Sequence, residues 1–448
     1  MKILIQGGRI LHPADGTEQP ADVAIADGRI VALGAAPADF VPERTLDARG
    51  CLVLPGLVDL SARMREPGQE HARMLETEMA AAVAGGVTSL VCPPDTDPIL
   101  DEQGLVEMLK FRSGRLHQAR LYPLGALTRG LKGEVLTEMV ELSESGCVGF
   151  SQAEVPIVDT QVLLRALQYA ATFGYTVWLR PQDAWLGGGV AASGALSMRM
   201  GLSGVPVVAE TIALMTLFEL MRATGARVHL CRLSSAAGVE LVRAAKASGL
   251  PVTCDVSINS LHLTDVDMGY FDSRTRLQPP LRQQADRAAL RAALADGTID
   301  ALVSNHTPVT EDEKALPFAE AEPGATGIEL LLPLALQWAR EEGVPIATAL
   351  ATVTTRPAAV LGRALGAEAD SAGRLAVGGT ADLCLWDPQD HWQVSGATLR
   401  SQSSYTPFGG HEMQGRVRAT LVGGQVVHEL PSAADAPACG CACQCGAA

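Results

Sequence analysis

The feature that most constrains the fold of this chain is a regular alternation of apolar, strand-like runs with helical patterns. Eight short apolar runs lie between residues 56 and 357: Leu57–Leu60, Val87–Val91, Arg120–Leu124, Val148–Phe150, Tyr175–Leu179, Arg227–Cys231, Val252–Asp255 and Asp300–Val303. Helical patterns fill the gaps between them, as at Glu76–Ala84, Thr160–Phe173 and Ala236–Ser248. Repeated strand–helix units indicate a parallel sheet, and eight of them close into a barrel. The sequence therefore predicts an α/β fold in which residues 56–357 form a (β/α)8 TIM barrel.

The two ends of the chain carry a different pattern, of short strands separated by tight turns. Strand-like runs fill residues 1–55 and return within residues 358–430. The dipeptides Asp27-Gly28 and Gly423-Gly424 are typical of β-hairpin turns. We expect the two segments to combine into one small β-sandwich beside the barrel.

Charge and hydropathy limit the partners of this chain. Its 448 residues carry a formal net charge of −15 at pH 7, which argues against nucleic acid and anionic membranes as partners. Apolar runs fall short of the roughly 20 residues that a membrane span requires. The N-terminus has no signal-peptide pattern. We therefore expect a cytoplasmic protein.

The ten cysteines fall into two groups. Six stand singly, several of them within apolar strand-like runs, as is typical of reduced cytosolic thiols: Cys51, Cys92, Cys147, Cys231, Cys254 and Cys384. The other four alternate with small residues between Cys439 and Cys445, within a tail at residues 431–448. We expect this tail to be disordered, and the alternative is capture of a soft metal ion by its thiols.

Active sites of TIM barrels lie at the carboxyl ends of the strands. The residues there are Ser61 and Arg63 after the first strand, Gln152 and Ala153 after the fourth, Arg180 after the fifth, Arg232 after the sixth and Asn305 after the eighth. A hydrolytic metal site needs imidazoles and carboxylates with free lone pairs. A guanidinium group has none and stays protonated, so the arginines would repel a divalent cation. The sequence predicts a rim without metal, cofactor or catalytic residues.

Several like charges at one partly buried site are costly unless they are paired. We therefore expect the arginines of the rim to contact an acid, and the nearby acids are Asp95, Glu154 and Asp183, or else a bound anion. His229 differs from Arg232 in strand parity, so we expect it to face the helix layer.

Several motifs between about residue 50 and residue 330 resemble those of dihydroorotases, which belong to the amidohydrolase superfamily. They are Pro55–Leu60, Arg65–Glu70, Gly85–Thr88, Pro279–Arg282, Asp296–Asp300 and Glu311–Lys314. The resemblance implies histidine ligands at positions 61, 63, 180 and 232, an aspartate near 152–153, and an aspartate at 305 that also shuttles protons. Each of these ligands is replaced here.

The resemblance also implies a substrate side, of which a remnant is left. Arg65, which grips the substrate carboxylate in the family, is kept. Asp95 stands where the family has an asparagine and would repel a carboxylate. His306 is kept, whereas Val309 occupies the place of a second histidine. The segment Val309–Gly324 would be a substrate lid in an active relative, and here we expect a flexible surface segment or a partner contact.

Loss of the whole ligand set within a retained scaffold resembles the inactive dihydroorotase homologues of bacteria. That resemblance implies a pseudoenzyme of pyrimidine biosynthesis that assembles with the catalytic chain of aspartate transcarbamoylase as a hetero-oligomer. One alternative is an active cyclic-amide hydrolase, dihydroorotase-like or hydantoinase-like, with an atypical or absent metal site. Another is an anion-binding sensor that uses Arg63, Arg65, Arg180 and Arg232.

Overall fold

The strands predicted for the barrel form one ring in the computed structural model, which describes residues 1–13, 16–68, 70 and 74–430. The ring strands are β8 (Leu57–Asp59), β9 (Val87–Cys92), β10 (Arg120–Pro123), β11 (Gly125–Ala126), β12 (Phe150–Ser151), β13 (Thr176–Leu179), β16 (Arg227–Leu230), β17 (Val252–Ser257) and β18 (Ala301–Val303). They pair in parallel, in the orders β10-β9-β8 and β11-β12-β13-β16-β17-β18. A parallel bridge between Ala62 and His306 closes the ring.

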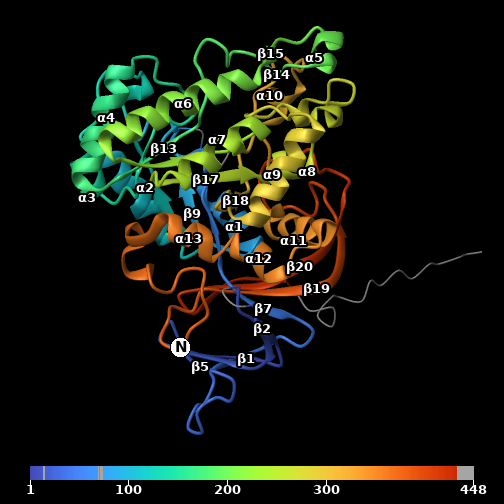
Figure 1. Ribbon diagram of the computed structural model, residues 1–448. Helices are drawn as coiled ribbons and strands as arrows, with labels where there is room; N and C mark the ends of the chain where they lie inside the picture. The colour runs from blue at the N-terminus through green and yellow to red at the C-terminus, as the bar shows by residue number, and fades with distance from the viewer. Residues whose placement is uncertain (14–15, 69, 71–73, 431–448) are drawn as a thin grey trace, which may run out of the picture.

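Helices that follow the successive ring strands surround the ring (Figure 1). These are α1 (Leu75–Ala84), α2 (Gln103–Arg115), α3 (Met139–Glu144), α4 (Thr160–Phe173), α6 (Val207–Thr224), α7 (Ala236–Ala247), α9 (Gln284–Asp296) and α11 (Leu331–Glu342). Shorter pieces are α5 (Ala195–Met200), α8 (Ile258–His262), α10 (Glu311–Ala315), α12 (Ile346–Ala351), α13 (Thr355–Leu361), β14 (Ala191–Ala192) and β15 (Gly204–Val205). None of the helices in the described ranges is long and apolar enough to cross a membrane.

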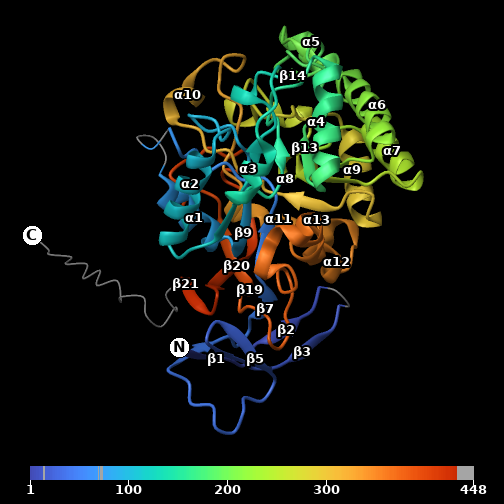
Figure 2. The same cartoon turned by 90° about the vertical axis from the view of Figure 1, so that its left-hand side faces the viewer.

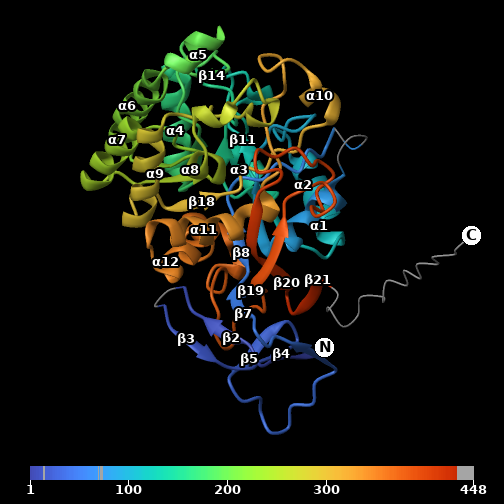
Figure 3. The same cartoon turned by 90° about the vertical axis from the view of Figure 1, so that its right-hand side faces the viewer.

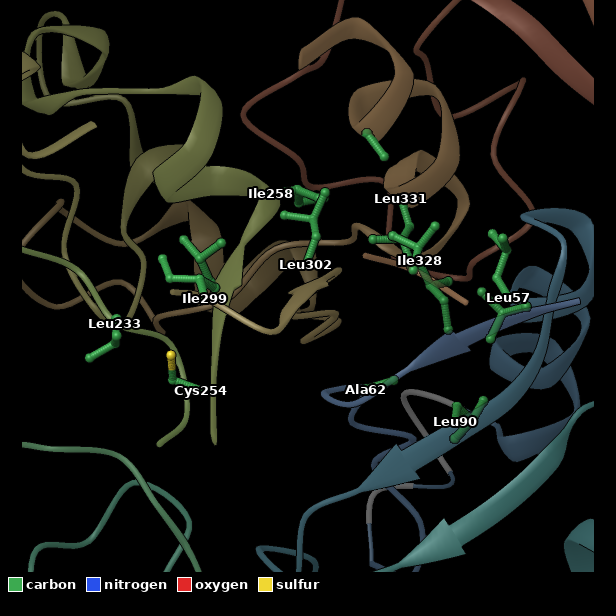
Figure 4. Close-up of a cluster of buried hydrophobic side chains, with 14 of the residues drawn as sticks. Leu57, Ala62, Leu90, Leu233, Cys254, Ile258, Ile299, Leu302, Ile328 and Leu331 are labelled. Carbon is green, nitrogen blue, oxygen red and sulfur yellow. The ribbon is translucent and has the colours of Figure 1, made fainter. Parts of the chain in front are cut away.

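The ring strands are buried on both faces, which explains why they read as continuous apolar runs. Alternate side chains point to the interior of the barrel and to the helix layer. On β13, Trp178 packs with the interior residue Val303, whereas Val177 belongs to the cluster beneath the helices. Figure 4 shows part of the outer cluster, where Leu57 of the first strand lies near Ile328 and Leu90 extends the cluster along the second strand.

The prediction that His229 faces the helix layer is wrong. Its ring lies 4.2 Å from the ring of Trp178, inside the barrel. Its Nε2 is 2.9 Å from Asp255 Oδ2 on the neighbouring strand. The parity argument failed because β16 ends at Leu230, and Arg232 takes a positive φ of 57° that breaks the alternation.

The two chain termini build the β-sandwich together (Figures 1 and 3). One sheet has the order β5-β4-β1-β6 and the other β21-β20-β19-β7-β2-β3. The N-terminal strands are β1 (Lys2–Gln6), β2 (Arg9–Leu11), β3 (Glu18–Pro20), β4 (Val23–Ala26), β5 (Arg29–Leu33), β6 (Arg44–Asp47) and β7 (Leu52–Pro55). The C-terminal strands are β19 (Leu383–Gln393), β20 (Glu412–Val422) and β21 (Gln425–Glu429). Apolar side chains such as Ile5, Ile25 and Leu383 fill the space between the sheets.

Both predicted hairpins are present. Ala26 pairs with Arg29 around Asp27 and Gly28, whose φ angles of 51° and 78° suit a tight hairpin turn. Val422 pairs with Gln425 around Gly423-Gly424.

The exact domain limits stay a prediction. The boundary predicted after residue 55 lies at the link between β7, which ends at Pro55, and β8, which begins at Leu57. The limit at residue 357 falls inside α13, and Ala358 and Leu361 pack with Val58 of the barrel. Barrel packing therefore continues past residue 357. The Cys439–Cys445 tail lies outside the described residues.

The segment Val309–Gly324 is folded against the barrel. Thr310 and Glu313 form a capping box at the start of α10. Val309 is fully buried, and the buried Lys314 Nζ donates to the carbonyl oxygens of Ser273 and Arg276. The expectation of a flexible surface segment is therefore not met.

Gly56 joins the sandwich to the barrel at a very close approach. A Cβ at this position would lie 2.2 Å from Thr88 Oγ1 and 2.7 Å from Thr88 Cβ. Thr88 is buried and donates to the carbonyl oxygen of Leu57, so it has little room to move. We expect Gly56→Ala to lower the free energy of unfolding by about 1–3 kcal/mol.

Chemical denaturation measures this change, and Gly104→Ala is the matched control. Gly104 lies in α2 with open space around its Cβ position, so alanine there is expected to raise stability by about 0.5–1 kcal/mol. Equal effects of the two substitutions would contradict the proposed close contact.

Candidate functional site

Three arginines and one glutamate meet at the carboxyl ends of the barrel strands. Arg63 follows β8, Arg180 follows β13 and Arg232 follows β16, while Glu154 follows β12. The parallel strands of a closed barrel end at one rim, which brings together side chains that are far apart in the sequence. This rim, the barrel mouth, is the place where TIM barrels carry their active sites.

The Glu154 carboxylate is the common partner of all three guanidinium groups. Its Oε1 lies 2.8 Å from Arg63 Nη2 and 2.5 Å from Arg232 Nη2, and its Oε2 lies 2.5 Å from Arg180 Nε. The arginine side chains are only 4–7% exposed, and that of Glu154 is 24% exposed. These ion pairs are therefore shielded from solvent.

The arginines determine the protonation of Glu154. Burial by itself would raise the pKa of its carboxyl, but Arg232, Arg180 and Arg63 outweigh burial and hold that pKa well below its usual range. Glu154 is therefore a charged counterion, and it is too weak a base to accept a proton at neutral pH.

Three further contacts fix Arg63 and Arg232. Arg63 Nε donates to Asp95 Oδ2 at 2.8 Å, and Arg63 Nη1 donates to Thr307 Oγ1 at 3.3 Å. Burial would lower the pKa of Arg63, but Asp95 and Glu154 raise it above its ordinary value. Arg232 Nη1 donates to Asn305 Oδ1 at 3.1 Å.

The expectation that acids hold these arginines is confirmed for Asp95 and Glu154. Asp183 instead accepts hydrogen bonds from the backbone N–H groups of Trp185 and Leu186, at 3.0 and 2.9 Å. It stabilises a turn of the loop after β13.

The remaining rim residues brace the backbone. Gln152 accepts from Thr128 Oγ1 at 3.0 Å and donates to the carbonyl oxygen of Leu131 at 2.8 Å. Ser61 donates through its backbone N–H to Asp59 Oδ1 at 3.2 Å. Ala153 is buried and takes a positive φ of 50°.

The substrate-side remnant is split between two places. Arg65 and Asp95 line the barrel mouth. His306 is fully buried, and its Nε2 lies 2.9 Å from Glu78 Oε2 on α1. The structure thus places His306 in the packing between barrel and helix layer, outside the lining of the mouth.

The mouth encloses a cavity of about 300 Å³. Its positively charged lining residues are Arg63, Arg65 and Arg232, and its negatively charged ones are Asp95, Glu154 and Glu322. Uncharged polar groups come from Gln278, Asn305 and Thr307. The charges within the lining offset one another, so the mouth contains its own counterions.

The residues at the mouth do not fit a hydrolytic divalent metal ion. Guanidinium groups cannot donate a lone pair, and the one carboxylate at their centre already neutralises them. Serine, alanine and asparagine at positions 61, 153 and 305 supply no imidazole or carboxylate. No step of a reaction can be derived through a metal held by these side chains.

A separate group of potential ligands lies deeper in the barrel. His229, Cys231 and Asp255 offer atoms within 4.8 Å of one another. Hydrogen bonds already satisfy two of them, because His229 Nδ1 lies 2.8 Å from Thr253 Oγ1 and Asp255 Oδ1 accepts from the Arg232 N–H. Three donors are one short of a structural zinc site.

Sequence reasoning missed two buried carboxylates that organise this end of the barrel. Glu78 accepts from Ser401 Oγ and pairs with His306. Glu210 accepts from the hydroxyls of Ser234 and Ser235, in the loop after β16 that also carries Arg232. The available signal was an acid among apolar residues on one helical face, as in α1 and α6.

Comparisons with known proteins place these observations in a family. A model of the dihydro-orotase-like family matches residues 50–237, and a model of the amidohydrolase family matches residues 206–428. The dihydroorotase-like protein of Pseudomonas aeruginosa is 46% identical over 96% of this chain and 100% of its own length. A dihydroorotase-like protein of Pseudomonas putida is 44% identical over 96% of this chain and 99% of its own. The dihydroorotase of Geobacter sp. is 38% identical over 96% of this chain and 100% of its own.

Solved structures support the fold. An L-hydantoinase (dihydropyrimidinase) from Arthrobacter aurescens superposes with a TM-score of 0.83 at 24% identity, over 95% of this chain and 96% of that chain. A D-hydantoinase (dihydropyrimidinase) from Thermus sp. gives a TM-score of 0.79 at 22% identity, over 96% and 97%. The predicted fold class, a TIM barrel with a β-sandwich, is confirmed.

Glu154 is expected to be a major source of stability. Glu154→Gln leaves three buried guanidinium groups without their central carboxylate, and breaking buried ion pairs in this way typically costs about 3–5 kcal/mol. Chemical denaturation of the variant at pH 7 measures the loss. The matched control is Glu219→Gln, because Glu219 pairs with Arg222 on the exposed surface of α6, where the loss should stay below about 0.5 kcal/mol.

The same variant has a pH signature. The folded-state pKa of Glu154 lies below its ordinary value of 4.5, so the stabilisation is present above about pH 4.5 and is lost as the pH falls through the folded-state pKa. Between pH 5 and pH 2.5, the unfolding free energy of the native chain should fall more steeply than that of Glu154→Gln. Parallel slopes would contradict the assigned role of Glu154.

Proposed function

This chain belongs to the dihydroorotase-like family of amidohydrolases, and we propose that it is a catalytically silent member that acts as an assembly partner of the aspartate transcarbamoylase catalytic chain. The single observation that supports the absence of catalysis is the set of side chains at the barrel mouth. Arginines stand at three positions where the family resemblance implies histidine ligands, and their side chains converge on Glu154.

A metal-free hydrolase would need a general base, and the three candidates Asp95, Glu154 and Asp183 are poorly suited to that role. Glu154 and Asp95 are paired with arginines, and Asp183 stabilises a turn. A base must hold its proton near the working pH. The alternative is that the chain hydrolyses a cyclic amide, as the family does. A turnover assay separates this alternative from a catalytically silent protein.

An anion sensor in the mouth has less support from the geometry. Of the four arginines that it would use, Arg63 and Arg232 are engaged by internal carboxylates and polar side chains. An incoming anion would have to compete with Glu154 at short range.

The retained scaffold supports the proposed assembly role. The barrel, its rim loops and the sandwich are complete among the described residues, although every ligand position has changed. The family resemblance then supplies the partner, in a cytoplasmic hetero-oligomer that needs no cofactor. We expect the contact to use surface loops and outer helix faces, and a stable contact buries well over ~1,000 Å².

We expect the chain to show no dihydroorotate hydrolysis, with or without added zinc. Arg63→His should not restore it, because Ser61, Arg180, Arg232 and Asn305 still leave the ion without a complete set of ligands. A spectrophotometric turnover assay checks this, with the Geobacter dihydroorotase as the positive control.

Elemental analysis complements the assay. A chain shortened to remove the Cys439–Cys445 thiols should carry well below one zinc per molecule. Stoichiometric metal in the barrel, or hydrolysis by the native chain that a chelator abolishes, would refute the silent-barrel assignment.

The complex itself is tested by sedimentation. Mixed at micromolar concentration, this chain and the transcarbamoylase catalytic chain from the same organism should sediment together with closed point-group symmetry, the barrel chains joining transcarbamoylase trimers. Deletion of the barrel chain should reduce transcarbamoylase assembly or activity.

A mouth variant serves as the control for the assembly role. Changing Arg63, Arg180, Arg232 and Glu154 together to glutamine removes the three arginines with their shared carboxylate, so a folded variant should restore assembly. If the two native proteins sediment separately and the transcarbamoylase is fully active alone, the assembly role is wrong.

A further inference from the structure

Arg180 differs from the other two arginines of the mouth. Arg63 and Arg232 each make hydrogen bonds to polar side chains as well as ion pairs. Within the described part of the chain, Nη2 of Arg180 has no hydrogen-bond partner, although the side chain is only 4% exposed, and Nε meets Glu154 Oε2 at 2.5 Å. Its close contact is the ion pair with Glu154 Oε2. A buried guanidinium with unsatisfied N–H groups is costly, and it indicates a missing acceptor.

The electrostatic surroundings of Arg180 lead to the same conclusion. Burial lowers its pKa, Glu154 opposes this, and the like charges of Arg232 and Arg63 lower the pKa further. The cluster holds three guanidinium groups against the two carboxylates of Glu154 and Asp95, an excess of one positive charge. A further anion beside Arg180 would neutralise that excess.

A cavity of about 160 Å³ lies on the side of Arg180, outside the barrel ring. It is bounded by α4 and α6, which lie side by side in Figures 1 and 2. Arg180 lines it together with a mostly apolar wall that includes Ile157, Leu163, Leu179, Trp185, Ile212 and Leu217. An apolar pocket with few polar groups is the usual form of a small-molecule site.

The rim of this cavity exposes apolar side chains that packing within the chain does not explain. Trp185 is 83% exposed, Val158 is 60% exposed and Ile212 is 44% exposed. These residues come from the loop after β13, the loop after β12 and α6. Clustered apolar exposure of this kind marks a binding site.

Asp183 also lines the cavity and sets a limit on the ligand's charge. Its Oδ1 is held by two backbone N–H groups of the loop, which offset part of its charge. Because Asp183 adds a negative charge to this cavity, the ligand can carry no more than a single carboxylate, and a dianion would be repelled by Asp183 and Glu154.

We propose that the cavity between α4 and α6 binds a small monocarboxylate with an apolar body, whose carboxylate accepts hydrogen bonds from Arg180. The size follows from the volume, because a cavity of about 150 Å³ holds one benzene molecule. Nη2 of Arg180 has almost no contact with solvent, so binding requires the guanidinium to turn toward the cavity while its pair with Glu154 persists. This site is independent of the assembly role.

Benzoate is the probe, tested on the full-length chain by thermal shift and titration calorimetry. Benzoate should raise the melting temperature in a saturable way. Benzamide has the same shape without the charge, and acetate has the charge without the apolar body. Each of the two should bind at least ten-fold more weakly than benzoate.

Three variants locate the binding. Arg180→Gln should abolish the benzoate shift, and Arg243→Gln, an exposed arginine of α7 paired with Glu240 and Asp296, should leave it unchanged. Ala213→Phe fills the cavity from α6 and leaves the mouth arginines intact, so it should abolish the shift even if Arg180→Gln fails to fold. Equal binding of benzoate and benzamide, or a benzoate shift that survives in Ala213→Phe, would overturn the site.

Discussion

The contact on which the barrel mouth depends is the cluster of three guanidinium groups around the Glu154 carboxylate. Burying three positive charges in one place is prohibitive without anions, since the effective penalty is several kcal/mol per ion. Glu154 meets all three at 2.5–2.8 Å, and Asp95 adds a second contact to Arg63. The arginines are therefore tolerable only as part of this cluster.

The backbone around the cluster explains how the side chains come to meet. Ala153, Arg232 and Asn305 have φ angles of 50°, 57° and 49°, a region that residues other than glycine avoid. Such conformations cost about 1–3 kcal/mol each and persist where the surrounding structure fixes them. All three lie at positions where the family resemblance implies metal ligands. At these positions Arg232 contacts Glu154, and Asn305 accepts a hydrogen bond from Arg232.

The sequence was sufficient for those features that depend on short-range pattern. The ring strands, the sandwich formed by both termini and the hairpins at Asp27-Gly28 and Gly423-Gly424 follow from periodicity and turn chemistry. Charge compensation predicted the partners Asp95 and Glu154. The orientation of His229 could not be predicted, because the positive φ at Arg232 interrupts the strand parity. The cavity between α4 and α6 could not be predicted from the sequence either, because it depends on how two helices and two loops pack together.

The cluster also explains how a barrel of this family can be rigid at its mouth without a metal. A metal bound by ligands from several strands would tie the strand ends together. Here Glu154 after β12 ties β8, β13 and β16 through Arg63, Arg180 and Arg232, and Asn305 extends the contact to β18. Because these pairs are largely buried, salt screens them much less than surface pairs. The ends of these strands are therefore held together by the chain's own side chains.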